Sequence, residues 1–232
     1  MYVGRIVSVG RSEGKSWVAY RVSSRSFPNR RAEIRGQSFL VSPLNAADLA
    51  RNPYIAYNCI RVLDDAAVVA NGTQADTILE KIEDGMRPRD AISLCLATLG
   101  YERDELDTPR IAGAVKGDRG WLGIAKKDEL RVQEFKLKDG QAYMVATYEK
   151  TGFESIVLGG KDSADIASQA FSLSFERPVC AAAALARSAE IAKDAKGFDL
   201  SRRSLGAHCT SCRPHAIRPS SRCRSLNLSE SA

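Results

Sequence analysis

The sequence predicts an α+β protein whose sheets are antiparallel. Several stretches place apolar residues at every second position, which is typical of half-buried strands, and short turns rich in Gly, Asp and Lys separate them. Other stretches repeat apolar residues every three or four positions, as amphipathic helices do. The order along the chain is strands, two helices, strands and two helices. Such segregated blocks favour an α+β fold over the strict alternation that builds a parallel sheet.

The first half of the chain contains two predicted hairpins and then two predicted helices. Strands are expected at 2–10, 17–23, 38–41, 57–63 and 66–70. The first helix is predicted because Ile78, Leu79 and Ile82 share one face. Pro88 begins the second helix, which is expected to end at Gly100.

The second half returns to a period of two and then to a helical period. Strands are expected at 111–115, 121–125, 130–135 and 142–148, with a short one at 155–158. Helices are predicted at 162–173 and at 178–192. The second of these helices is rich in Ala, the residue with the highest helix propensity.

The positive charge of the chain is concentrated at its C-terminal end. The chain has 34 Lys and Arg against 28 Asp and Glu, a net charge of +6. Residues 201–232 hold six Arg and one acid, Glu230, which leaves 28 basic and 27 acidic residues in 1–200. This distribution does not favour a nucleic-acid-binding domain. We predict a catalytic domain over 1–200 and a disordered Ser- and Arg-rich tail over 201–232.

Residues 1–200 contain no histidine, which limits the chemistry of that region. Ser-His-Asp catalysis, Cys-His catalysis and the usual His-rich metal sites are excluded there. Acids and bases must then be Asp, Glu, Lys, Tyr, Cys or the N-terminal amine. Cys59, Cys95 and Cys180 lie among apolar residues and are expected to be inert core thiols.

Both histidines belong to the tail, where cysteines accompany them. His208, Cys209, Cys212 and His215 have a spacing that suits zinc, and Cys223 follows. One such group without a second paired module, in a segment without a foldable core, is weak support for a metal site. We therefore predict that the protein holds no metal.

The sequence predicts neither a membrane protein nor a secreted one. No apolar run approaches the length of about 18 to 20 residues that a membrane helix needs. The first ten residues lack the uninterrupted apolar region of a signal peptide. We expect a cytoplasmic protein, and the edges of the predicted meander leave room for a homo-oligomer.

The densest polar stretch is 21–30, where a predicted strand gives way to a loop. It contains three Arg, three Ser, an Asn and a Phe. Converging guanidinium groups and hydroxyls suit a phosphate, and Phe27 suits stacking on a flat heterocycle. An ordinary solvated edge strand would have the same composition, and composition alone favours that interpretation.

Three other segments offer groups for binding or catalysis. Tyr57 and Asn58 can donate to a developing oxyanion, although a half-buried tyrosine with a satisfied hydroxyl is the commoner case. Asn71 stands just before a predicted helix, whose first N–H groups can hold an anion. The acidic run 102–110 offers a carboxylate base, or is simply a solvated linker.

These segments resemble the archaeal-type IMP cyclohydrolase family. The matching stretches are Met1–Ile6, Tyr20–Arg30, Arg51–Arg61, Asn71–Gly72, Asp104–Ala112 and Thr147–Glu149. The resemblance covers about residues 1–192, and its two long motifs each span ten or more consecutive positions. It implies a four-layered αββα sandwich like that of N-terminal-nucleophile hydrolases.

The resemblance also implies a reaction, the last step of de novo purine biosynthesis. In that step the ring of 5-formamidoimidazole-4-carboxamide ribonucleotide closes to give IMP and water. Because the step involves neither redox chemistry nor group transfer, we expect no cofactor. The partner is then a small purine-precursor nucleotide rather than a nucleic acid or a membrane.

The motifs supply residues for this chemistry. The predicted catalytic residues are Arg30 and Tyr57, as donors around the formyl oxygen, and Glu105, as the base. The predicted substrate-binding residues are Arg21, Ser24, Arg25, Phe27, Asn29, Asn58, Asn71 and Arg110. Among these, Arg21, Ser24 and Arg25 are assigned to the phosphate or ribose, and Phe27 to stacking.

Other classes of function stay open at this point. An amide hydrolase of the same fold needs Cys, Ser or Thr at its mature N-terminus, whereas the sequence begins with Met1 and Tyr2. A purine-nucleotide-binding protein without catalysis would bind IMP but close no ring. RNA binding through the Arg-rich tail is a third possibility.

Overall fold

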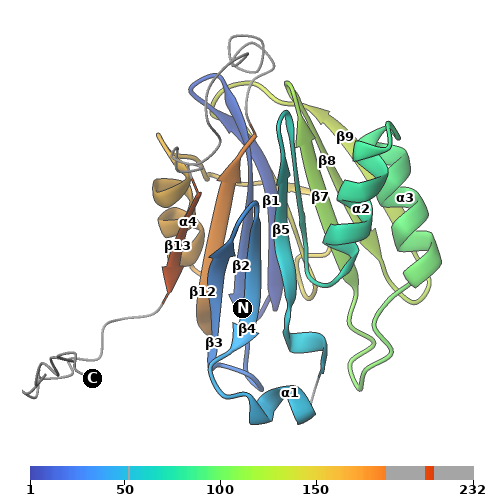
Figure 1. Cartoon of the computed structure of the whole chain (residues 1–232), viewed down its shortest axis with the longest axis vertical. Coiled ribbons are helices and arrows are strands. Elements are labelled where there is room, and N and C mark those ends of the chain that lie inside the picture. The colour runs from blue at the N-terminus through green and yellow to red at the C-terminus, as the bar shows by residue number, and fades with distance from the viewer. Residues whose placement is uncertain (52, 187–206, 212–232) are drawn as a thin grey trace, which may run out of the picture.

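The computed structural model describes residues 1–51, 53–186 and 207–211. Its strands form two sheets in which every neighbouring pair is antiparallel (Figure 1). Sheet A has the order β11-β10-β1-β2-β12-β13, and sheet B has the order β3-β4-β5-β6-β7-β8-β9. The α+β prediction with antiparallel sheets is therefore confirmed.

The strands and helices have the following bounds. Sheet A contains β1 (Arg5–Ser12), β2 (Lys15–Ser23), β10 (Ala142–Ala146), β11 (Glu154–Ser155), β12 (Pro178–Leu185) and β13 (Ala207–Ser211). Sheet B contains β3 (Arg30–Arg35), β4 (Ser38–Pro43), β5 (Tyr57–Leu63), β6 (Ala66–Ala70), β7 (Arg110–Lys116), β8 (Arg119–Ala125) and β9 (Leu130–Lys136). The helices are α1 (Ala47–Arg51), the 3₁₀ turn η1 (Pro53–Ile55), α2 (Gln74–Glu83), α3 (Pro88–Leu99) and α4 (Ser163–Ser172).

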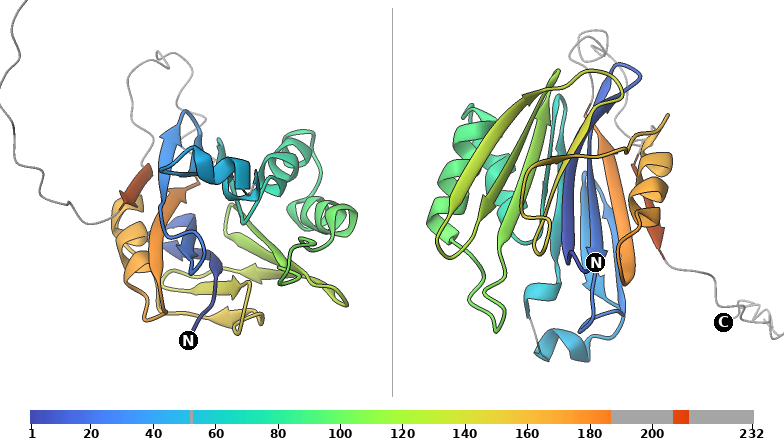
Figure 2. Two further views of the ribbon diagram at one scale, coloured as in Figure 1. Left: turned by 90° about the horizontal axis from the view of Figure 1, so that it is seen from below. Right: turned by 180° about the vertical axis from the view of Figure 1, so that it is seen from behind.

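The two sheets pack face to face, and helices cover their outer faces (Figure 2). Val9 and Tyr20 of sheet A share one buried cluster with Phe39 and Ile111 of sheet B. On the outer face of sheet B, α2 and α3 bury their apolar stripes, and on the outer face of sheet A, α4 does the same. Strands with both faces covered explain why β6 is buried at every position.

Most predicted elements are present close to their expected positions. The predicted hairpins correspond to β1–β2 and β5–β6, and the first three strands of the predicted meander correspond to β7, β8 and β9. The fourth, β10, is present but does not continue the meander, because it pairs with β1 and β11 in sheet A. Helix α4 begins after Asp162, whose carboxylate accepts a hydrogen bond from the backbone N–H of Asp165 at 2.8 Å. The short strand expected at 155–158 is β11, displaced to Glu154–Ser155.

The helix predicted over 178–192 is wrong as far as the structure describes it. Residues Pro178–Leu185 form strand β12 instead, and β12 lies between β2 and β13. Cys180 and Ala182 contribute to the core between the sheets, while Ala181 and Ala183 contribute to the core under α4. Burial of both faces in the middle of a sheet outweighs the helix propensity of alanine, because propensity is a weak local preference.

The region 31–53 holds more regular structure than its mixed sequence suggests. Strand β3 forms the edge of sheet B, and α1 precedes η1 in the connection to β5. At the C-terminal end, Ala207–Ser211 pairs with β12 as β13. The domain boundary predicted at residue 200 lies outside the described residues. Among the residues considered for zinc, His208 and Cys209 belong to β13, whereas Cys212, His215 and Cys223 lie outside the described residues. Among the described helices, none is long and apolar enough to cross a membrane.

Candidate active site

Charged and phenolic side chains gather at one end of the strands of sheet B, beside sheet A. In an antiparallel sheet, alternate strands run in the same direction, so β3, β5 and β7 all begin at this end. Their first residues are Arg30, Tyr57 and Arg110. Arg5 is the first residue of β1 in the facing sheet. Four strand starts therefore supply side chains to one place.

A buried carboxylate lies among these cations. The Oε2 atom of Glu102 is 3.5 Å from Nη2 of Arg5, and its Oε1 atom is 3.4 Å from Nη1 of Arg110. The side chain of Glu102 is only 7% exposed. Arg30 also acts on this carboxylate electrostatically. We call the group of Arg5, Tyr20, Arg30, Tyr57, Glu102 and Arg110 the Glu102 cluster.

Two phenols complete the Glu102 cluster. The hydroxyls of Tyr20 and Tyr57 are 2.7 Å apart, and the rings meet edge to face. Burial raises the pKa of both tyrosines above the ordinary value. Arg5 opposes the shift at both tyrosines, and Arg30 opposes it at Tyr57. Both phenols therefore stay protonated at neutral pH and can donate hydrogen bonds.

The pKa of Glu102 is raised because burial penalises its charged form. Asp104 raises this pKa further, whereas the guanidinium groups of Arg5 and Arg110 lower it. A carboxyl group whose pKa is raised toward neutrality can both take up and return a proton during a reaction.

The loop that carries Glu102 is held by a separate hydrogen-bond network. The backbone N–H of Glu102 donates to the carbonyl of Thr108 at 2.8 Å. The hydroxyl of Thr108 donates to Asp104 at 2.7 Å and lies 2.7 Å from the hydroxyl of Tyr148. Asp104 thus orders the loop, and the loop presents Glu102 to the cations.

The structure brings together three of the residues that the sequence predicted for the site, namely Arg30, Tyr57 and Arg110. Arg21 does not join them. It follows Tyr20 in β2, and successive strand residues point to opposite faces. Its Nη2 atom donates to the backbone carbonyl of Phe175 at 2.9 Å, and burial lowers its pKa to about 10.

The other predicted residues of segment 21–30 shape the turn before β3. The hydroxyl of Ser24 accepts from the backbone N–H of Phe27 at 3.0 Å, and the carbonyl of Phe27 accepts from Nε of Arg30 at 3.1 Å. Arg25 is exposed and contacts Glu176. Asn29 is exposed, and its backbone carbonyl accepts from Leu44. Through Ser24 and Phe27, this segment orients Arg30.

Asn58, Asn71 and Glu105 occupy positions that differ from the predicted site. Asn58 donates to the carboxylate of Asp76 at 2.9 Å, on the face opposite to Tyr57. Asn71 is buried and bonded to the backbone of Pro109 and of Ile111, the latter in β7. Glu105 is exposed in a turn, and within the part of the chain that the structure describes it makes no hydrogen bond or ion pair.

Three members of the Glu102 cluster were missed by the sequence reasoning: Arg5, Tyr20 and Glu102. Arg5 lies inside the matching stretch Met1–Ile6, and Tyr20 is the first residue of the matching stretch Tyr20–Arg30. Glu102 opens the acidic run that was singled out as a source of a base. The available signal was the strand alternation, which places Tyr20 rather than Arg21 on the face of Val18 and Val22.

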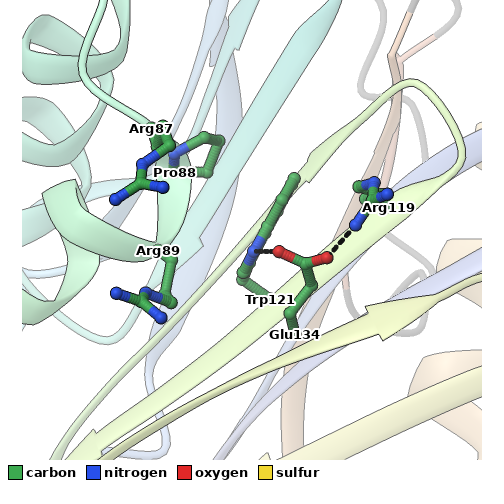
Figure 3. A pocket seen from close by; sticks show the side chains of 6 residues that line it. All are labelled: Arg87, Pro88, Arg89, Arg119, Trp121 and Glu134. Carbon is green, nitrogen blue, oxygen red and sulfur yellow. Dashed lines mark hydrogen bonds and ion pairs between the residues drawn. The ribbon is translucent and has the colours of Figure 1, made fainter.

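A hollow lies on the outer side of sheet B, between the start of α3 and strands β8 and β9 (Figure 3). It has a volume of about 340 Å³ and is lined by Arg87, Pro88, Arg89, Arg119, Trp121 and Glu134. Its guanidinium groups are ion-paired, those of Arg87 and Arg89 with Asp90 and that of Arg119 with Glu134. None of the predicted site residues lines it.

The residues that the structure describes contain no group of three or more His, Cys, Asp or Glu arranged to hold a metal. The Glu102 cluster itself combines three cations with one carboxylate, which attracts anions rather than metal ions. Its buried carboxyl group, neutral phenols and guanidinium groups are chemically suited to acid–base work on an anionic small molecule.

Comparison with known proteins identifies the family. A family model described as IMP cyclohydrolase-like protein matches residues 2–190. The chain is 57% identical over 187 residues to an IMP cyclohydrolase of Methanothrix thermoacetophila, covering 81% of this chain and 94% of the relative. It is 49% identical over 185 residues to an IMP cyclohydrolase of Methanocella arvoryzae, covering 79% and 92%. An IMP cyclohydrolase of Thermococcus kodakarensis is 41% identical over 202 residues, covering 86% and 96%. The chain therefore belongs to the IMP cyclohydrolase-like family, as its motifs predicted.

Proposed function

We infer that the protein is an enzyme with IMP cyclohydrolase activity and that the Glu102 cluster is its active site. The activity follows from family membership over most of the chain. The location of the site is our proposal, and one observation carries it. A carboxyl group with a raised pKa is buried between guanidinium groups and neutral phenols at the junction of the two sheets.

The reaction forms one bond and breaks another. The carboxamide nitrogen of 5-formamidoimidazole-4-carboxamide ribonucleotide attacks the formyl carbon of the same molecule. The nitrogen loses one proton, and negative charge develops on the formyl oxygen. The formamide nitrogen loses its own proton as it forms a double bond to the former formyl carbon, and the oxygen leaves as water with these two protons. Because an amide is a poor nucleophile, the enzyme gains most by holding the reacting atoms in contact, which can lower the barrier by about 7 to 11 kcal/mol in favourable cases.

We propose that Glu102, rather than Glu105, is the group that moves protons. Glu102 is buried and faces the other members of the cluster, whereas Glu105 is exposed. As a carboxylate it would accept the amide proton, and as a carboxylic acid it would return that proton to the departing oxygen. The prediction from the sequence that Glu105 is the base is the alternative that the exchange of the two carboxylates tests.

Tyr57 and Arg30 are proposed to stabilise the developing oxyanion. Tyr57 keeps its proton at neutral pH and lies beside Arg30 and Arg5. Donors that are already oriented before the reaction stabilise such a charge more effectively than water does. Tyr20, hydrogen-bonded to Tyr57, positions its hydroxyl.

The charge of the cluster suits a phosphorylated substrate. Arg5, Arg30 and Arg110 outnumber the single carboxylate of Glu102, and a phosphate monoester carries about −1.5 to −2 charges at pH 7. The substrate-binding roles predicted for Ser24, Phe27, Asn29 and the remaining residues outside the cluster stay predictions. No cofactor is required, because the ring closure transfers neither electrons nor a group.

We further propose that the fold is the four-layered αββα sandwich of N-terminal-nucleophile hydrolases. The proposal is supported by the order α4, sheet A, sheet B and then α2 with α3.

An amide hydrolase would need a nucleophile at a processed N-terminus, which intact-mass measurement would detect. A role in purine biosynthesis is compatible with the predicted cytoplasmic location and leaves the oligomeric state open.

The site assignment is tested by exchanging two carboxylates of the same loop. Glu102→Gln is expected to lower kcat by about 10²-fold or more, because an amide cannot accept the proton. Glu105→Gln, an exposed matched control, is expected to keep wild-type turnover. IMP formation is followed by ultraviolet absorbance, with thermal unfolding as the check on folding. The opposite ranking would move the active site to Glu105. IMP binding without any ring closure by the wild type would instead support a non-catalytic nucleotide-binding protein.

A further inference from the structure

We propose that Asn71, Gly72 and Gln74 form a clamp that holds Arg110 against Glu102, and that cyclisation depends on this clamp. The inference deepens the proposed function, because it rests on Glu102 as the proton-transferring group. Asn71 and Gly72 belong to the connection between β6 and α2, and Gln74 is the first residue of α2. The sequence predicts an anion-binding helix start here. The structure gives them a different task, since their polar atoms are bonded within the protein.

Asn71 holds the backbone on both sides of Arg110. Its Nδ2 atom donates to the carbonyl of Pro109 at 2.9 Å, and its Oδ1 atom accepts from the backbone N–H of Ile111 at 2.8 Å. Its own backbone N–H donates to the carbonyl of Ile111 at 3.2 Å. These three bonds continue the pairing of β6 with β7 by one residue. They fix the backbone position from which the side chain of Arg110 extends.

Gln74 holds the guanidinium group of Arg110. It is the first residue of α2, it is fully buried, and its Oε1 atom accepts from Nη1 of Arg110 at 3.4 Å. Its Nε2 atom donates to Oδ1 of Asn71 at 2.8 Å and to the carbonyl of Ile111 at 3.3 Å. A buried amide whose donor and acceptor are both used in this way has one defined orientation.

Gly72 leaves the space that the clamp requires. A Cβ atom at this position would lie 2.6 Å from Oε1 of Gln74 and 3.1 Å from Nη1 of Arg110. Both contacts are shorter than an unstrained carbon would make. Any side chain at residue 72 would therefore push apart the two atoms whose contact defines the clamp.

The clamp acts on catalysis through the charge that Glu102 faces. Nη1 of Arg110 lies 3.4 Å from Oε1 of Gln74 and also 3.4 Å from Oε1 of Glu102. The charged groups acting on Glu102 are Arg5 from β1, Arg30 from β3, Arg110 from β7 and Asp104 from its own loop. If Arg110 moves away, the carboxylate of Glu102 loses one of three cations that favour its ionised form. The repulsion from Asp104 is then opposed by fewer cations, and the pKa of Glu102 rises.

The test replaces Gln74 with a residue of similar length that has no hydrogen-bonding amide. Gln74→Met is expected to lower kcat by about tenfold to a hundredfold, since a displaced catalytic constellation has costs of that order. The acidic limb of the pH profile of kcat should move to higher pH, because Glu102 would then ionise less readily. A loss of packing alone would not move this limb.

Two further variants separate positioning from folding. Ile78→Val removes one buried methylene from the same helix and is the matched control, expected to leave the pH profile in place. In an Arg110→Met background, Gln74→Met is expected to cause no additional loss of kcat, because residues that act through one another are not additive.

The outcomes distinguish this proposal from the proposed function. If Gln74→Met keeps the wild-type kcat and pH profile, or raises KM alone, the clamp is refuted while Glu102 keeps its role. Full additivity of Gln74→Met and Arg110→Met would also refute it. If Glu102→Gln is active, the assignment of the active site to Glu102 fails whatever the clamp variants show.

Discussion

Replacing Tyr57 by Phe separates the structural role of this side chain from its catalytic role. The change removes one hydroxyl that lies 2.7 Å from the hydroxyl of Tyr20, in a position where both side chains are buried. The ring of Tyr57, which packs edge to face on Tyr20, is kept. The expected loss of stability therefore comes from the polar contact alone and not from a cavity.

The size of this loss can be estimated from the partner left behind. A buried hydroxyl without a hydrogen bond costs about 1 to 3 kcal/mol, so Tyr57→Phe should lower the free energy of unfolding by that amount. A domain is typically stable by about 5 to 15 kcal/mol, so the variant stays folded. Urea unfolding measures the loss. In the double variant with Tyr20→Phe the two effects should be less than additive, because no unpaired hydroxyl remains.

The catalytic consequence should be larger than the structural one. If the Tyr57 hydroxyl donates to the formyl oxygen in the transition state, its removal lowers kcat by about 10²-fold, which corresponds to about 2.7 kcal/mol of barrier. Turnover is measured by ultraviolet absorbance on protein shown to be folded. Tyr20→Phe loses the same hydrogen bond and serves as the control, with a smaller expected effect on kcat. Wild-type turnover in folded Tyr57→Phe would refute the oxyanion role.

Two other predictions concern charge and packing. The pKa of Glu102 is higher in the folded protein than in the unfolded chain, so the folded state binds this proton more tightly. The stability gained in this way is fully present below the pKa of the unfolded chain and is lost as pH rises through the pKa of the folded protein. Unfolding free energies of wild type and Glu102→Gln, compared across that window, should differ in this pH dependence, and parallel curves would contradict the raised pKa. Gly123→Ala places a Cβ 2.5 Å from Cγ2 of Ile92 and 2.8 Å from Cδ1 of Leu96, so α3 must shift from β8. We expect a loss of about 1 to 3 kcal/mol in urea unfolding, and an unchanged midpoint would show that α3 adapts freely.

The local sequence was sufficient to place most elements and to single out segments that contribute to the candidate site. Period-two and helical patterns, together with turn residues, identified both hairpins, the strands β7 to β10 and three of the helices, but not that β10 belongs to the other sheet. The long motifs contained Arg30 and Tyr57, and the acidic run contained Glu102 and Arg110. These signals are local, because they depend on neighbours within a few positions along the chain.

Tertiary structure decided what each of these residues faces. Pro178–Leu185 has the composition of a helix, but its place between two strands with apolar layers on both sides makes it β12. Strand alternation turns Tyr20 toward Tyr57 and Arg21 away from it. The burial of Glu102 and the exposure of Glu105 arise from the folded loop, and composition does not distinguish two acids three residues apart. The chemical type of each residue and the spacing of apolar residues can be read from the sequence. The burial and the electrostatic surroundings of a side chain depend on residues that are far away along the chain.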